Sequence, residues 1–250
     1  MQAFWTLTRR ELAGFFLSLI GYVIIAAALF LIGFSFVVML ANLRQEPTLM
    51  PISELWYITP FFWLILLLSA PAITMRLFAL EKFSGTYETL MTTPVSDAQV
   101  VLAKFTAAFL FYVLMWLPLL ACLFVVRHYT NDTSSWDPGA LCGTFLGIVL
   151  FGSVFVSVGC CASALTRSQV IAAMMSLLFG ASIFLLGFLA AQFAAHPGWW
   201  GQVLVCFNLF EQMHDFARGI VDTRPVILAL SLTFLFLFLT LRVVESRRWK

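Results

Sequence analysis

Long apolar segments alternate with short polar ones along the whole chain. Six apolar segments are long enough to cross the roughly 30 Å hydrocarbon core of a bilayer as helices, for which about 20 residues are needed. These expected spans cover residues 16–41, 57–83, 96–126, 139–165, 170–195 and 225–244. The pattern predicts an all-α integral membrane protein with six transmembrane helices, in which residues 1–250 form a single transmembrane domain.

Two further segments mix apolar and polar residues without reaching the length of a span. Met1–Phe15 places charged residues among apolar ones, which is typical of an amphipathic helix lying on the membrane surface. Trp199–Phe210 is apolar but too short to span, and the charged segment Glu211–Asp222 follows it. We therefore expect a re-entrant or extracytoplasmic helical segment between spans five and six.

Composition and charge agree with a multi-pass membrane protein. The chain is 62% hydrophobic and 10% charged, whereas soluble domains carry about 25% charged residues. Six spans place both termini on one side, and that side holds all of the 14 Lys and Arg residues except Arg44, Arg127, Arg218 and Arg224. By the positive-inside rule, we expect both termini in the cytoplasm and the chain in the cell (inner or plasma) membrane.

The sequence contains none of the motifs that would make the chain an enzyme. It lacks the G-x-x-x-x-G-K-[ST] phosphate loop, the HExxH zinc motif and the G-x-S-x-G nucleophile motif. The expected spans hold no paired carboxylates, which argues against a proton-relay carrier. The five Cys residues form no CxxC pair, so we interpret them as small apolar residues and expect no metal site. No cleavable signal peptide is expected, because the first apolar segment is too long.

The longest ordered polar interruption is Arg76–Lys104, between the second and third spans. Gly85 is expected to end the helix that enters it, and Pro94 to end any helix before it. Ser96 followed by Gln99 has the pattern of a capping box, which predicts that the third helix starts at Ser96.

A short helix is expected between these two breaks, over Thr86–Thr93. Tyr87, Leu90 and Met91 fall on one face of it, at helical spacing. Two interpretations stay open at this point: a docking element for a partner, or a structured loop that has none.

The motif in this loop is similar to that of a known family. Residues 81–90 read EKFSGTYETL, and the segments TPVS and KF follow them. This order of residues resembles the cytoplasmic loop of ABC-2-type permease subunits. The pattern of that loop is E-R/K-x-x-G-T-x-E-x-L, then Ser/Thr-Pro, then G/A-K. Lys82 stands where that family often has Arg. Arg9–Leu12, His214–Gly219 and Glu245–Trp249 resemble the terminal motifs of its gliding-motility-type branch, which is also similar to the nitrous-oxide-reductase maturation permease.

The resemblance implies partners and roles. Such subunits have six transmembrane helices, pair with a second permease copy or a related permease chain, and each bind a cytoplasmic ABC ATPase through the loop between spans two and three. ATP and Mg would belong to that partner, so no cofactor is expected in this chain, and neither is nucleic acid; membrane lipid surrounds it. Thr86–Thr93 would be the coupling helix. The residues expected to serve ATPase coupling are Glu81, Gly85, Thr86, Tyr87, Glu88, Leu90, Met91 and Pro94.

Charged residues of the extracytoplasmic segment share one helix face. They are Glu211, His214 or Asp215, Arg218 and Asp222, spaced by three or four residues. They form either a contact for an extracytoplasmic partner or a substrate, or a helix face solvated by its own ion pairs. A metal site at Glu211 and His214 would lack a third ligand at matching spacing.

Small residues recur every four positions on the fourth span. Gly139, Gly143 and Gly147 begin the series. Such a face lets another helix approach closely, either in a second subunit or within the same bundle.

Three functions fit these observations. The first is a permease subunit that couples ATP hydrolysis by a separate cytoplasmic ATPase to movement of a substrate across the membrane. The second is a mechanotransmission subunit, which passes ATP-driven motion to an extracytoplasmic partner without moving a substrate. The third is a passive membrane scaffold. The sequence does not name a substrate.

Overall fold

The computed structural model describes residues 2–45, 52–86, 95–130, 137–193 and 207–246, and within them all regular secondary structure is helical. The helices are α1 (Gln2–Phe16), α2 (Leu19–Gln45), α3 (Ile52–Ile58), α4 (Pro60–Thr74), α5 (Ala79–Ser84), α7 (Asp97–Thr130), α8 (Pro138–Leu165), α9 (Gln169–Phe193), α11 (Leu209–Ala217) and α12 (Thr223–Ser246). In the part of the chain that the structure describes, six segments are long and apolar enough to cross a membrane: α2, α4 with α5, α7, α8, α9 and α12. The predicted all-α membrane fold is confirmed.

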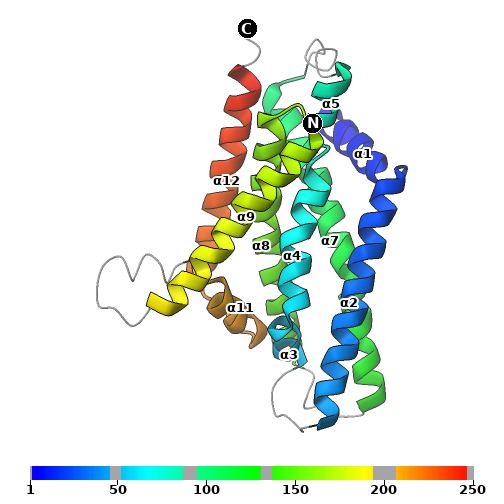
Figure 1. Cartoon of the computed structure of the whole chain (residues 1–250), viewed down its shortest axis with the longest axis vertical. Coiled ribbons are helices and arrows are strands. Elements are labelled where there is room, and N and C mark those ends of the chain that lie inside the picture. The colour runs from blue at the N-terminus through cyan, green and yellow to red at the C-terminus, as the bar shows by residue number, and fades with distance from the viewer. Residues whose placement is uncertain (1, 46–51, 87–94, 131–136, 194–206, 247–250) are drawn as a thin grey trace.

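The six long segments run up and down between two ends of the molecule (Figure 1). The surface helix α1, the short helix α5 and the last turn of α12 lie at one end, which we call the termini end. The short helices α3 and α11 lie at the opposite end. The described part of the chain therefore has one set of short helices at each end of the bundle.

Helix α8 occupies the centre of the bundle. It contacts α4, α7, α9, α11 and α12, and 78% of its most apolar stretch is buried, against 17% for α12. Helices α2, α9 and α12 instead expose large apolar side chains along their length. In a membrane those side chains face lipid or another subunit, whereas most of α8 is enclosed by neighbouring helices.

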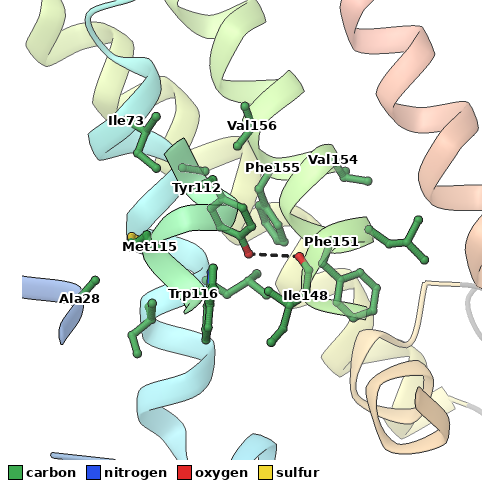
Figure 2. Close-up of a cluster of buried hydrophobic side chains, with 14 of the residues drawn as sticks. Ala28, Ile73, Tyr112, Met115, Trp116, Ile148, Phe151, Val154, Phe155 and Val156 are labelled. Carbon is green, nitrogen blue, oxygen red and sulfur yellow. Dashed lines mark hydrogen bonds between the residues drawn. The ribbon is translucent and has the colours of Figure 1, made fainter. Parts of the chain in front are cut away.

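The core between α7 and α8 is fixed by an aromatic residue (Figure 2). The Tyr112 hydroxyl donates a hydrogen bond of 3.2 Å to the carbonyl oxygen of Ile148, and the side chains of Trp116, Phe151 and Phe155 surround it. A Cβ atom at Gly152 would lie 2.0 Å from the Tyr112 ring. The aromatic ring thus fits only because α8 has no side chain at that point.

The start of the first span differs from its expected position. Phe16 belongs to α1, and the chain turns at Leu17 and Ser18 before α2 begins at Leu19. The Ser18 hydroxyl accepts a hydrogen bond of 3.2 Å from the backbone N–H of Gly21, as an N-cap residue does. This cap allows α1 to lie at an angle to α2 (Figure 1).

The expected helix over residues 57–83 is corrected by the structure, which divides it into α3, α4 and α5. Pro60 opens α4 and holds Thr59 in an extended conformation, with φ of −67° and ψ of 136°. Helix α4 ends at Thr74, one turn after the internal Pro71. The chain then turns through residues 75–78, and α5 starts at Ala79.

The third and sixth spans are longer than expected. Helix α7 starts at Asp97, where the Ser96 hydroxyl accepts a hydrogen bond of 3.4 Å from the Gln99 N–H. Its 34 residues correspond to about 51 Å at 1.5 Å per residue. Helix α12 starts at Thr223, two residues before Pro225. A proline is tolerated in the first turn of a helix, because the N–H that it lacks would have no partner within the helix there. The fourth and fifth spans differ from their expected bounds by a residue or two.

Candidate functional site

The short helix α5 begins the loop that the sequence singled out. It ends at Gly85, whose φ of 76° lies in the left-handed region that favours glycine. Gly85 therefore ends the helix, as predicted. The expected coupling residues Tyr87, Glu88, Leu90, Met91 and Pro94 lie outside the described residues.

The Glu81 side chain of α5 points into the bundle, toward α7. Its carboxylate lies 2.8 Å from the ammonium of Lys104, which is also 3.2 Å from the carboxylate of Glu11 on α1. Lys104 is only 2% exposed, while the two glutamates are 18% and 16% exposed. One buried cation therefore joins two helices that are far apart in sequence.

Arg10 completes this group at the surface. Its guanidinium lies 2.8 Å from Glu11 and 3.6 Å from Glu81, and its side chain is 55% exposed. The hydrogen bond to Glu11 raises the pKa of Arg10 above its ordinary value. We call Arg10, Glu11, Glu81 and Lys104 the Lys104 cluster. Its two positive and two negative charges balance.

A second attachment joins α5 to the end of α8. The Lys82 ammonium donates to the carbonyl oxygen of Ala164, near the C-terminus of α8, where a positive charge is favoured by the helix dipole. The Ser163 hydroxyl accepts hydrogen bonds from the backbone N–H groups of Phe78 and Ala79, at 3.1 and 3.2 Å. These bonds satisfy amides at the start of α5, which a helix cannot satisfy by itself.

A second charged group lies at the opposite end of the bundle. Glu54 of α3 is 4% exposed, and its carboxylate accepts from Arg218 Nε and Nη2 at 3.4 and 3.2 Å. His214 Nε2 lies 3.0 Å from the same carboxylate. The ring of Tyr57 meets the His214 ring edge to face, with centroids 6.1 Å apart. We call Glu54, Tyr57, His214 and Arg218 the Glu54 cluster.

Burial changes the acidity of Tyr57 in the Glu54 cluster. It raises the pKa of Tyr57 to about 12, and the negative charge of Glu54 adds to this shift. Tyr57 is therefore held in its neutral form, in which the aromatic ring packs beside His214 without adding a second negative charge to Glu54.

Helix α11 rests directly on α8. A Cβ atom at Gly143 would lie 2.2 Å from the carbonyl oxygen of Phe216, so only glycine permits this contact. Gly219 follows α11 with φ of 78°, and the Ile220 N–H donates to the Asp215 carbonyl oxygen at 2.9 Å, which forms a Schellman end. The small-residue face at Gly143 is therefore used for packing within the chain.

The four residues expected to contact an extracytoplasmic partner or substrate separate into two pairs. His214 and Arg218 face Glu54. Glu211 and Asp215 instead line an open groove of about 460 Å³ between α11 and the start of α12. Among the described residues, no group of three His, Cys, Asp or Glu side chains is arranged to hold a metal ion.

The comparisons with known proteins now identify the family. A family model described as "ABC-2 family transporter protein" matches residues 53–243. The chain belongs to the ABC-2 transporter family. A search of curated proteins found no match.

Membership of the ABC-2 family makes the chain a multi-pass membrane protein and the permease component of an ABC transporter. ABC-2 permeases normally work with a cytoplasmic ATPase, often dimerise and are typically non-catalytic subunits. The match covers α5 with its contacts to Lys104 and to α8, and the Glu54 cluster, whereas Arg10 and Glu11 of α1 lie outside it. The resemblance to the gliding-motility-type branch and to the nitrous-oxide-reductase maturation permease stays a prediction.

Sequence reasoning missed the roles of Glu54 and Lys104 in this ABC-2 permease. Lys104 lies between Ala103 and Phe105 within a helix of membrane length, and an ionisable residue in such a segment usually has a partner. That signal could have identified it. Glu54 belongs to a segment that looked like an ordinary polar loop, and no pattern linked it to Arg218, 164 positions later.

Proposed function

We propose that this chain couples ATP hydrolysis by a separate cytoplasmic ATPase to movement of a substrate across the membrane. The observation that carries the proposal is the double attachment of α5, to α8 through Lys82 and Ser163 and to α7 and α1 through Glu81. A segment that only closed a loop would not need bonds to three other helices. These bonds suit a segment on which a partner exerts force.

The proposed orientation follows from charge. Most Lys and Arg residues belong to the termini end, so that end faces the cytoplasm and the ATPase. The opposite end, with the Glu54 cluster, then faces outward.

The mechanism has three steps. ATP binding brings two partner ATPase subunits together and displaces the loop that begins at α5. The bonds of Lys82 and Ser163 pass this displacement to the end of α8. Because α8 contacts most other helices, its shift changes the packing of the whole bundle. ATP can drive this change only because it binds the two arrangements with different affinity.

A second function is favoured by the contacts of α8. The same helix is bonded to α5 at one end and carries α11 at the other. Displacement of α8 would therefore reach the groove that Glu211 and Asp215 line. A mechanotransmission subunit would use this route to move an extracytoplasmic partner without passing a substrate.

One experiment tests the main proposal. The chain is purified through a tag from its native membranes in mild detergent, and the bound proteins are identified by mass spectrometry. We expect a protein with a G-x-x-x-x-G-K-[ST] motif to be recovered with the wild type and lost with Glu88→Arg. Glu211→Arg, a charge reversal at the opposite end, should leave it bound.

The outcomes separate the candidate functions. Recovery of no ATP-binding protein with the intact chain would refute both coupled functions and leave the scaffold. For the recovered complex, ATP-dependent flux in proteoliposomes supports the permease. ATP hydrolysis without flux, together with loss of function on Glu211→Arg, supports mechanotransmission.

A further inference from the structure

Lys104 is the point at which three separate segments meet. It belongs to α7, and its ammonium contacts Glu81 of α5 at 2.8 Å and Glu11 of α1 at 3.2 Å. It also lies 5.4 Å from the ring centroid of Phe78, in the turn before α5. With 2% of its side chain exposed, the ammonium relies on these groups in place of water.

Helix α1 has two different kinds of attachment. Phe15 and Phe16 pack against Phe111 of α7, with ring centroids 4.8 and 5.5 Å apart. Its link to α5 consists of charged groups, and of these only Lys104 is buried. The apolar contact holds α1 on the bundle, whereas the ionic contact ties it to the loop that the ATPase is proposed to move.

We propose that Lys104 is a positioning residue that makes α1 move together with α5. This inference rests on the proposed function and extends it, because it makes the surface helix a second moving part beside α8. Force on the loop would then be divided at α5, with Lys82 leading to α8 and Glu81 leading through Lys104 to α1.

The burial of Lys104 is the physical reason for joint movement. If α1 and α5 separated, the ammonium would lose one carboxylate in a site that water does not reach, and a buried unpaired charge is strongly unfavourable. Arg10 imposes no such constraint. Its guanidinium is 55% exposed, so water can replace either glutamate during movement.

Distance measurements between α1 and α5 test the proposal. Spin labels are attached at Arg9 and Phe83, which are exposed and lie outside the contacts of Lys104. The distance is measured in the purified complex without nucleotide and after trapping with ATP and vanadate. We expect one narrow distance in the wild type, unchanged between the two states. In Lys104→Met we expect the narrow distance to be lost and a nucleotide-dependent change to appear.

Two further variants test whether the change in Lys104→Met is caused only by misfolding. The triple variant Glu11→Gln, Glu81→Gln, Lys104→Met leaves no buried charge unpaired, so it should fold while still releasing α1. Lys104→Arg retains the positive charge and should keep the narrow distance.

The outcomes are decisive in each case. A wild-type distance that changes with nucleotide, or a triple variant that keeps the wild-type distance in both states, would overturn the proposal. If no ATPase is recovered with the wild type, the proposed function fails. The nucleotide-free distances of wild type and triple variant still test the link between α1 and α5, so the two failures are distinguishable.

Discussion

The two ends of the bundle use buried charge in opposite ways. At the termini end the buried group is a cation, Lys104, which two partly exposed glutamates share. At the opposite end it is an anion, Glu54, which His214 and Arg218 share. In both clusters one buried charge joins helices that are distant in sequence.

The difference between the clusters is in their access to water. The glutamates around Lys104 are less than one-fifth exposed, whereas His214 and Arg218 are 33% and 48% exposed. His214 and Arg218 can therefore be hydrated when their contact with Glu54 is lost. Glu11 and Glu81 are less accessible to water when their contact with Lys104 is lost. We infer that removal of Lys104 leaves its partners poorly hydrated, whereas removal of Glu54 leaves its partners in contact with water.

The largest expected effect comes from Lys104→Met. This change removes the buried cation that Glu11 and Glu81 share and leaves beside them the exposed Arg10. Removing one partner of a buried pair costs about 3–5 kcal/mol. The apparent melting temperature in detergent should fall clearly. Changing Glu11 and Glu81 to Gln in the same variant should restore most of the lost melting temperature. If the melting temperature stayed low, the loss in Lys104→Met would not come from unpaired charge, which would contradict the account.

A smaller effect is expected from Glu54→Gln. His214 and Arg218 remain hydrated, so the loss should be about 1–3 kcal/mol, which is typical of a hydrogen-bonded charged group. Glu211→Gln on the exposed side of α11 is the matched control, and should change stability by no more than about 0.5 kcal/mol. If Glu54→Gln were as damaging as Lys104→Met in the same melting assay, the contrast between the two ends would be wrong.

A still smaller effect is expected from Arg10→Gln. An exposed ion pair typically contributes about 0.2–1 kcal/mol, and salt screens it. The difference in melting temperature between Arg10→Gln and wild type should shrink in high salt. A loss comparable to that of Lys104→Met would mean that Arg10, and not Lys104, holds α1 in place.

The last expected effect, at Tyr57, is absent near neutral pH and appears only at high pH. Its folded-state pKa of about 12 lies above the ordinary value of 10, so its contribution to stability is complete below pH 10 and is lost as the pH rises to 12. Tyr57→Phe should therefore lose less stability than wild type across that interval. Glu54→Gln should bring the tyrosine titration, followed by ultraviolet absorbance, to lower pH, because Glu54 contributes to the shift. An unchanged titration would contradict this.

The sequence predicted the fold class because apolar length is a strong signal. The six spans, the cap at Ser96 and the break at Gly85 follow from local patterns, and the structure contains them. The divisions at Ser18 and Thr59 were missed, since long apolar segments hide a single capping or extended residue.

The site was predicted less completely than the fold. Glu81 was recognised from its motif, but a motif does not say that the side chain points inward to Lys104. His214 lies on α11 and Arg218 directly follows its last residue, yet their partner Glu54 lies more than 150 positions earlier. Long-range partners of this kind depend on how the helices pack, which no local spacing encodes.

The central claim is that the loop beginning at α5 is the contact for a separate ATPase. Its most direct test is a photo-crosslinking amino acid at Thr86, which is exposed at the termini end, with Thr223 at the opposite end as control. After irradiation in native membranes, we expect Thr86, and not Thr223, to crosslink to an ATP-binding protein identified by mass spectrometry. No such crosslink from Thr86, or an equal one from Thr223, would contradict the account.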